Sequence, residues 1–312
     1  MDIDLINKEN LNLHKYLVEY KETVLPGLNE NTRKALETDI SQYRQYCETI
    51  GSKALFSDPD KMKDICRKYV QHLSASDFAH QTIKRKIASL RHLIGIAGVP
   101  NPWNDKLFSM FFSNMMKQKP ARSRQAVPLT YQKLSQLNGL MTDKSLHTLR
   151  DRALINLAFD SLYRVSNIRV IQFDHLDFKT NTVFSQWSKT DKTGDGAYSY
   201  VSNETLEYIS AWIDAAAINQ GYLFRRLNRN AVISEDTLSS QSIWNIYKKW
   251  GAKVGLPNLS CHSTRTGAVV TMVENGVDSA AIALAGQWKS PAMPIRYAAQ
   301  VSVRASGMSK IR

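Results

Sequence analysis

The chain has 312 residues, 43% of them hydrophobic, which suffices for one large domain or two ordinary domains with proper cores. Its 41 Lys and Arg against 28 Asp and Glu give a net charge of +13, which favours a polyanionic partner, although a basic surface alone also fits an acidic membrane or mere solubility. The acidic, polar start and the lack of any apolar run near the roughly 20 residues of a membrane span predict neither a signal peptide nor a transmembrane segment, and we expect a cytoplasmic protein.

The sequence gives no support for several enzyme classes. Cys47, Cys66 and Cys261 lie far apart without CxxC spacing, which indicates buried reduced thiols and no metal site. P-loop, GxSxG and HExxH patterns are absent, so an NTPase, a serine hydrolase and a zinc protease are not supported.

Residues 29–116 have a helical pattern throughout. Four helices are expected, over 32–50, 60–73, 81–98 and 104–116. In the third, an apolar stripe is formed by Ile83, Ile87, Leu90 and Ile94. The remaining arc carries Lys84, Arg85, Lys86 and Arg91. This arc is either an ordinary solvated face or a surface that lies against a DNA groove.

A basic stretch follows at 117–128, KQKPARSRQAVP, and its Pro, Ser and cations predict an exposed linker at a domain boundary. The predicted division is an N-terminal domain at 1–118, a linker at 119–128 and a second domain at 129–312. Four cations here suit contact with a phosphate backbone: Lys117, Lys119, Arg122 and Arg124.

The second domain begins with a helix capped by Thr130 and a helix through LRDRALINLAFDSLY. Residues 173–201 change to a β-type period and predict a small antiparallel sheet, whose last loop carries Lys189 and Lys192. Helices are expected over 204–218 and 240–254. Between them YLFRRLNRN supplies Arg225, Arg226 and Arg229, which either contact DNA or form a solvated surface.

The most informative stretch runs from residue 260 to residue 297. Ser260 is expected to cap a helix that continues to Gly276, which places His262 and Arg265 on one face. A short helix fits 278–285, after which a turn presents Trp288. Ser290 and Pro291 then begin another short helix, which carries Tyr297.

These side chains make chemical sense around a phosphodiester. Arginine offers a charged planar fork to phosphate oxygens, and an indole N–H can donate one more hydrogen bond. Tyrosine can be the nucleophile, but its usual pKa of about 10 requires cationic neighbours or a base. One imidazole could manage the proton.

The order and spacing of these residues resemble the C-terminal signature of the tyrosine site-specific recombinases, the phage integrase family. HSTR is followed by Trp288, 23 residues after Arg265, and by Tyr297, nine residues after Trp288. Most members have histidine at the position of Trp288, so the resemblance is closest to the Cre-like branch. HxxR alone is a weak signal, whereas the ordered set is much stronger.

The resemblance implies a mainly α protein, with an N-terminal four-helix core-binding domain and a mostly α catalytic domain that contains a small antiparallel sheet. It also implies that the two domains clamp a DNA duplex. Arg164, in SLYRVSNIRV, resembles the first catalytic arginine, with Asn167 where the family has Glu or Asp. Lys189 resembles the lysine that protonates the departing 5′ oxygen, and Lys192 is the alternative.

The implied mechanism is a pair of transesterifications in which Tyr297 forms a 3′-phosphotyrosyl link. Arg164 and Arg265 would neutralise the phosphate, Trp288 would donate a hydrogen bond, and His262 would assist proton transfer. No metal, ATP or other cofactor is expected. The implied partner is double-stranded DNA with an inverted-repeat target site, bound by a homotetramer on two sites and associated with the nucleoid.

Two alternatives stay open at the level of sequence. One is a type IB topoisomerase-like enzyme that relaxes DNA alone, and the other is a catalytically idle DNA-binding accessory protein. Only fifteen residues follow Tyr297, so a C-terminal helix donated to a neighbouring protomer must be short, absent or lost by truncation.

Overall fold

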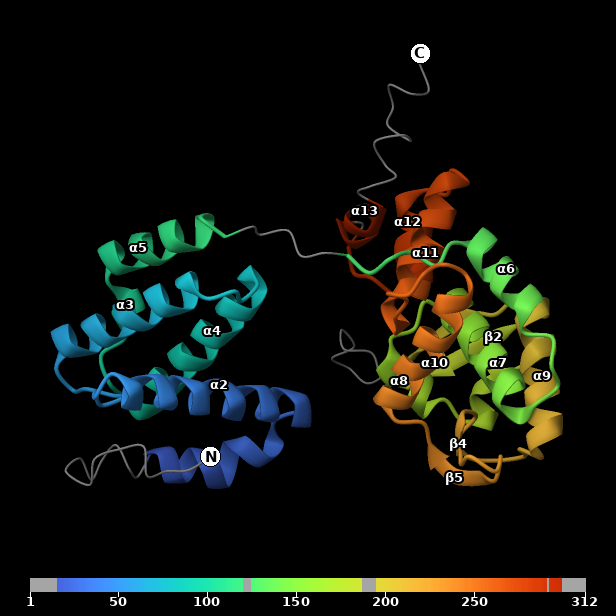
Figure 1. The fold of residues 1–312 in the computed structure, drawn as a ribbon, viewed down its shortest axis with the longest axis horizontal. Coiled ribbons are helices and arrows are strands. Elements are labelled where there is room, and N and C mark those ends of the chain that lie inside the picture. Colours follow the sequence, from blue (N-terminus) through green and yellow to red (C-terminus); the bar gives the residue numbers. More distant parts are fainter. Residues whose placement is uncertain (1–15, 120–124, 187–194, 291, 299–312) are drawn as a thin grey trace, which may run out of the picture. The chain divides into compact units, whose positions relative to one another are not determined.

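The computed structural model describes residues 16–119, 125–186, 195–290 and 292–298. The chain divides into two compact units, unit 1 at Met1–Arg124 and unit 2 at Gln125–Arg312 (Figure 1). The division falls inside the 119–128 stretch that the sequence predicts as a linker. No described helix combines the length and the apolar composition that a bilayer crossing needs.

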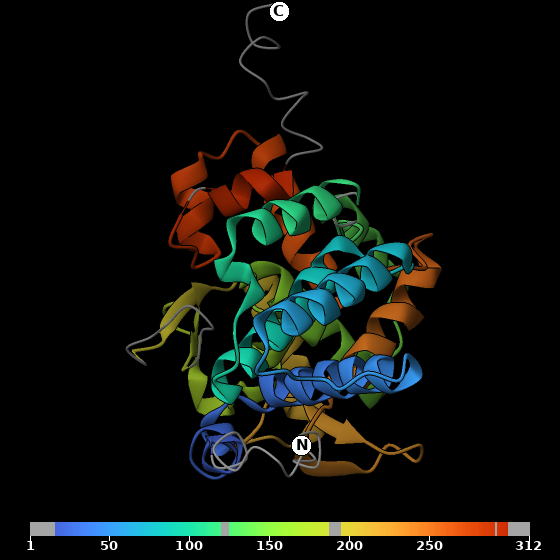
Figure 2. The ribbon, with the colours of Figure 1, turned by 90° about the vertical axis from the view of Figure 1, so that its left-hand side faces the viewer.

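Unit 1 is helical. After short turns at Tyr20–Val24 and Leu25–Gly27, its main helices are α2 (Glu30–Thr49), α3 (Pro59–Ala75), α4 (His80–Ala97) and α5 (Lys106–Lys117), with a 3₁₀ turn at Pro102–Asn104 before α5. Figures 1 and 2 show α2 and α5 on opposite sides of this unit, with α3 and α4 between them.

Side-chain caps set where these helices begin. Asn29 accepts a hydrogen bond from the Asn31 N–H, and Asp58 accepts one from the Lys61 N–H at 2.9 Å. Asp105 caps α5 in the same way through the Phe108 N–H at 2.8 Å. Because these caps satisfy amide groups that a helix leaves unpaired, α2 and α3 begin one or two residues earlier than the apolar pattern predicts.

The predicted apolar stripe of α4 is confirmed, since Ile83, Ile87, Leu90 and Ile94 are all buried. The placement of Lys86 on the exposed arc is wrong. Lys86 is only 3% exposed, and its amino group bonds to Gln42 and lies 3.5 Å from the Asp39 carboxylate. Because α2 packs against α4, it covers a wider arc of α4 than the stripe alone predicts.

Unit 2 combines helices with two small sheets. Its helices are α6 (Tyr131–Leu140), α7 (Leu146–Asp160), α8 (Val165–Val170), α9 (Asn203–Ala216), α10 (Ser240–Lys253), α11 (Cys261–Glu274), α12 (Ser279–Ala285) and α13 (Ala292–Ala298). The buried helix α7 packs against both α9 and α11, so it forms the centre of the core. The fold is therefore mainly α, as the sequence predicts.

The predicted antiparallel sheet is confirmed. It has the order β1 (Leu176–Asp177), β2 (Thr182–Ser185) and β3 (Ala197–Tyr200), and Val183 of β2 pairs with Ser199 of β3. A second antiparallel pair, β4 (Arg225–Leu227) with β5 (Ile233–Thr237), was not predicted. The segment expected only as a cationic connection is thus one arm of a hairpin.

The three predicted C-terminal helices are confirmed as α11, α12 and α13. Asp278 caps α12 by accepting hydrogen bonds from the Ala280 and Ala281 N–H groups. Figure 1 shows α11, α12 and α13 gathered at one end of unit 2, with the β4–β5 hairpin at the opposite end. The end of unit 2 that is formed by α11, α12 and α13 holds the side chains that the sequence analysis singles out.

Candidate active site

Helix α11 provides His262 and Arg265 and is held in place at its first turn. The Ser263 hydroxyl accepts a hydrogen bond from the Ser260 N–H at 3.0 Å, which forms half of a capping box. The Ser263 carbonyl accepts from the Leu129 N–H at 2.9 Å. Gly267 lets the Leu129 backbone come close, because a Cβ there would stand 1.8 Å from the Leu129 oxygen.

Arg265 is buried and lies at the centre of the site. Its Nη1 donates to the Leu162 carbonyl and its Nη2 donates to the Gly286 carbonyl at 2.8 Å. The guanidinium lies over the Trp288 ring, 4.3 Å from the ring centre. One planar fork therefore ties the loop before α8 to the turn that carries Trp288.

Tyr297 is half-buried beside these residues. Its hydroxyl lies 2.9 Å from His262 Nε2, and its ring centre lies 5.3 Å from that of Trp288. The Tyr297 phenol also interacts electrostatically with Arg265, and this opposes the lowering of the arginine's pKa by burial and by Arg164. The phenolic oxygen thus stands between an imidazole and a guanidinium.

Burial decides the protonation of His262. It lowers the pKa of the imidazole below its usual value, and the positive charges of Arg265 and Arg164 act in the same direction. His262 is therefore neutral near pH 7, and its Nε2 can accept the Tyr297 proton.

Arg164 precedes α8 and is half-buried. Its positive charge acts on Arg265. The pKa of Arg265 is lowered to about 10, mainly by burial and to a smaller extent by the charge of Arg164. Among the described residues, no carboxylate forms an ion pair with either guanidinium. Two uncompensated cations in one partly buried site fit an anionic ligand.

Asn167 lies in the first turn of α8, three residues after Arg164. Its side chain is buried and its amide donates to the Ser185 hydroxyl of β2 at 2.8 Å. The residue therefore links α8 to the three-stranded sheet.

Two buried donors at the site lack a partner among the described residues, Arg265 Nε and Trp288 Nε1. Leaving a buried donor unpaired costs about 1–3 kcal/mol. A site that keeps two such donors beside uncompensated cations has the character of a ligand site rather than of a structural core.

Sequence reasoning missed the backbone that holds Arg265. Leu162 and Gln287 have φ values of 52° and 54°, in the left-handed region that residues with a Cβ seldom adopt. Leu162 supplies one acceptor carbonyl itself, and Gln287 directly follows the other at Gly286. Carbonyl acceptors have no signature in a sequence, so only the fold could reveal them.

Comparison with known proteins decides the family. The model of the phage integrase family matches residues 128–302, more than half of the chain. The chain belongs to the phage integrase family. It is a tyrosine recombinase.

Relatives of this recombinase extend over both units. An integrase/recombinase XerD homolog of Selenomonas ruminantium is 29% identical over 287 residues, covering 88% of this chain and 83% of the relative. A tyrosine recombinase XerC of Roseiflexus sp. (strain RS-1) is 22% identical over 270 residues, covering 82% of this chain and 79% of the relative.

Solved structures share the fold. The integrase of transposon Tn1549, in complex with transposon right end DNA, has a TM-score of 0.64 at 14% identity, covering 91% of this chain and 93% of that chain. The XerH site-specific recombinase, bound to its difH substrate before cleavage, has a TM-score of 0.64 at 10% identity, covering 96% of this chain and 90% of that chain.

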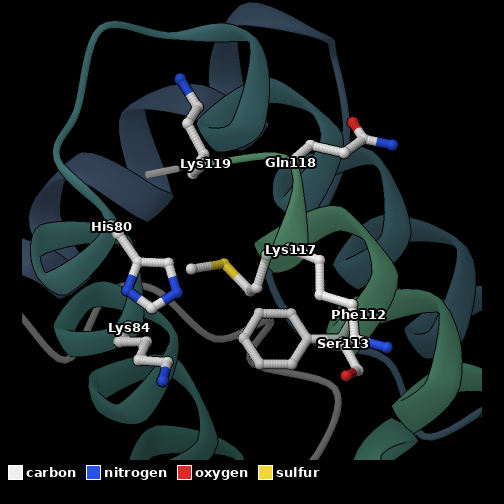
Figure 3. A pocket seen from close by; sticks show the side chains of 8 residues that line it. His80, Lys84, Phe112, Ser113, Lys117, Gln118 and Lys119 are labelled. Atoms are coloured by element: carbon white, nitrogen blue, oxygen red, sulfur yellow. The ribbon is translucent and has the colours of Figure 1, made fainter. Parts of the chain in front are cut away.

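The recombinase has further predicted site residues in unit 1. A cavity of about 840 Å³ lies where the start of α4 meets the end of α5. Figure 3 shows the side chains of Lys84, Lys117 and Lys119 around it, and the Lys119 amino group donates a hydrogen bond to the Ser76 carbonyl at 2.5 Å. The cavity is lined by His80, Lys84, Phe112, Ser113, Met116, Lys117, Gln118 and Lys119.

The other predicted cations of α4 differ in their surroundings. Arg91 is exposed and lies 5.7 Å from the Trp103 ring centre. Arg85 is about half exposed but forms an ion pair with the buried Asp39, and Lys86 is buried beside it. Four further predicted residues, Lys189, Lys192, Arg122 and Arg124, lie outside the described residues.

Proposed function

We propose that this tyrosine recombinase cuts and rejoins DNA through a 3′-phosphotyrosyl intermediate on Tyr297. The observation that carries the proposal is the Tyr297 hydroxyl 2.9 Å from His262 Nε2, beside the Arg265 guanidinium and within the field of Arg164. A neutral base and two cations around one phenol suit attack on a phosphodiester.

In the proposed cleavage step, the Tyr297 oxygen bonds to phosphorus and the bond from phosphorus to the 5′ oxygen breaks. The phenolic proton passes to His262. Arg164 and Arg265 stabilise the charge on the non-bridging oxygens, and Trp288 Nε1 donates one hydrogen bond. The departing 5′ oxygen takes a proton from Lys189, with Lys192 as the alternative donor.

Rejoining reverses these bonds. The 5′ hydroxyl of the partner strand attacks the phosphotyrosyl phosphorus and gives its proton to Lys189, and the bond from phosphorus to the Tyr297 oxygen breaks as that oxygen regains its proton from His262. Because the phosphotyrosyl bond conserves the energy of the phosphoester, the exchange requires no ATP. With two arginines on the phosphate, no metal is required either. The proposed assembly is a homotetramer on two inverted-repeat sites, acting at the nucleoid.

Unit 1 is proposed as the core-binding domain and 129–312 as the catalytic domain. The proposed contacts to the phosphate backbone are Lys84, Arg85, Arg91, Lys117 and Lys119, followed by Arg122 and Arg124 in the linker. Support comes from the exposure of Lys84 and Lys117 beside the cavity of unit 1 and from the net charge of +13. Lys86 is not included because it is buried.

The test is to trap the covalent complex on nicked duplexes drawn from a random DNA library. We expect an adduct on a restricted set of symmetric sites, and none with Tyr297→Phe. Exchange between two copies of a selected site would distinguish recombination from relaxation by a topoisomerase. An equal yield of adduct from Tyr297→Phe would refute the assignment of the nucleophile.

A further inference from the structure

Gln287 makes a side-chain contact that the proposed mechanism does not use. Its Nε2 donates a hydrogen bond to the Ser199 hydroxyl at 3.0 Å, across 88 positions of sequence. Ser199 lies within β3, is only 8% exposed and pairs with Val183 of β2. The contact therefore joins the turn before Trp288 to β3, an outer strand of the three-stranded sheet.

Tyr163 belongs to the same cluster. Its hydroxyl lies 2.9 Å from the Val183 carbonyl and 3.2 Å from the Ala197 carbonyl, so it can donate to β2 or β3. Burial raises the pKa of the Tyr163 phenol, while hydrogen bonding with Ser199 and Gln287 opposes that rise. Three side chains from distant segments thus meet around one buried point.

Each of these segments carries a residue proposed for the reaction. Tyr163 directly precedes Arg164, and Gln287 directly precedes Trp288. The chain between β2 and β3 contains Lys189 and Lys192 in its sequence. The cluster is therefore the place where the arginine loop, the hairpin and the Trp288 turn are tied together.

The backbone of Gln287 adds an independent observation. Its φ of 54° places it in the left-handed region, which costs a residue with a Cβ roughly 1–2 kcal/mol and glycine almost nothing. Unlike asparagine or aspartate, glutamine is not favoured there. Strain of this kind concentrates at functional sites, and here it aims the Gln287 amide at β3.

We infer that Gln287 is a positioning residue, which fixes the β2–β3 hairpin against the Arg265–Trp288 pocket so that the departing 5′ oxygen is protonated. The inference rests on the proposed function. Gln287 does not touch the reacting atoms in this account. It acts by fixing the position of β3, at the base of the hairpin, relative to the phosphate that Arg265 and Trp288 are proposed to bind.

A leaving group that needs no proton separates this role from a merely structural one. When sulfur replaces the bridging 5′ oxygen, a thiolate leaves, and thiols have a pKa of about 8.5 against about 15.7 for water, the simplest model of an alkoxide leaving group. Loss of proton donation therefore slows cleavage of the oxygen substrate but not of the sulfur substrate. Damage to the pocket as a whole would slow both.

The experiment measures single-turnover formation of the covalent adduct on matched oxygen and sulfur duplexes. Gln287→Gly removes the amide and relieves the backbone strain, and Ser199→Ala removes its acceptor. We expect each to slow cleavage of the oxygen substrate by about ten- to a hundredfold. We expect the sulfur substrate to be cleaved within about threefold of the parent rate. Since both variants break one contact, the double variant should be little worse than either single variant.

Ala217→Gly is the matched control. Ala217 has a φ of 49° at the exposed end of α9, so its replacement relieves similar strain away from the site. It should cleave both substrates at the parent rate, and thermal unfolding should show Gln287→Gly to be at least as stable as the parent.

The remaining outcomes are decisive. Equal losses on both substrates, or no loss in either variant, overturn the positioning role while leaving the proposed function in place. If the parent itself forms no adduct on any duplex, the proposed function fails and the inference fails with it.

Discussion

Arg265 has two tasks that a single residue type can combine. Its Nη groups bond to two carbonyls, its Nε has no partner among the described residues, and the plane lies over the Trp288 ring. The same guanidinium therefore assembles the pocket and supplies positive charge to it. A lysine could supply the charge but could not span two carbonyls.

Arg265→Lys should consequently damage both stability and activity. Leaving a buried carbonyl unpaired costs about 1–3 kcal/mol, and losing one preorganised donor costs about a hundredfold or more in rate. Urea unfolding and adduct formation measure the two effects. Arg229→Lys, at an exposed position beside β4, is the control and should change neither. If Arg265→Lys were as stable as the parent protein, the two hydrogen bonds of the Arg265 guanidinium would not contribute to stability.

The protonation of His262 predicts how cleavage depends on pH. Because its pKa lies below the usual value of about 6.5, the imidazole remains a base to lower pH than an exposed histidine. Cleavage should stay level from pH 8 to pH 6.5 and fall only when the pH drops through the lowered pKa. His262→Gln should be slow at every pH and should lose this acid limb. If the cleavage rate fell with a midpoint above pH 6.5, the conclusion that His262 is neutral near pH 7 would be wrong.

The same shift predicts a change in stability. The native state binds the His262 proton less tightly than the unfolded chain does, so stability is unaffected above the unfolded pKa of about 6.5. It declines as the pH falls from there toward the lowered pKa. Thermal unfolding of the parent and of His262→Gln between pH 5 and pH 8 should show this decline only in the parent.

The helices were predictable because local chemistry marks them. Asn29, Asp58 and Asp278 cap helices at positions where the sequence already shows Asx residues before an apolar period. The β4–β5 hairpin was not predictable in this way. Its arms are short and carry several charges, as in Arg225–Leu227, so they lack the alternation that identifies strands.

Two features of the site depend on packing between elements, which no local pattern reports. Lys86 is buried because α2 brings Asp39 against α4, and the stripe of α4 alone does not show how far α2 reaches. The carbonyls that hold Arg265 belong to Leu162 and Gly286, whose side chains give no hint of this task. The order of His262, Arg265, Trp288 and Tyr297, by contrast, was readable directly.

The position of α11 depends on a glycine. A Cβ at Gly267 would overlap the Leu129 backbone, which cannot yield as a flexible side chain would. Gly267→Ala should therefore destabilise unit 2 by about 1–3 kcal/mol and slow cleavage, because it displaces His262 and Arg265. Gly139→Ala is the control, since nothing lies within 4 Å of a Cβ there, and it should be neutral or slightly stabilising. If the two variants had equal thermal stability, the position of α11 would not depend on the lack of a Cβ at Gly267.

At the scale of the whole molecule, the net charge of +13 and the three lysines that line the cavity of unit 1 predict salt-dependent DNA binding. Replacing Lys84, Lys117 and Lys119 by Gln should weaken binding to all sequences alike. Each lost phosphate contact should reduce the slope of log affinity against log salt by about 1. The slope is measured by binding a labelled duplex between 50 and 200 mM salt.

Lys34→Gln is the matched control for these lysines, because Lys34 is an exposed cation of unit 1 that pairs with Glu30 on α2. It should leave the slope unchanged. A triple variant with the parent slope would place the DNA elsewhere on the molecule.

The central claim is that the Tyr297 phenol, activated by His262 and two arginines, becomes joined to a DNA 3′ phosphate. Peptide mapping of the trapped protein–DNA adduct by mass spectrometry tests it most directly. We predict a single nucleotide-bearing peptide that contains Tyr297, with the phosphate on the 3′ side of the break and a free 5′ hydroxyl on the other side. A nucleotide attached to any other residue, or through a 5′ phosphate, would contradict the account.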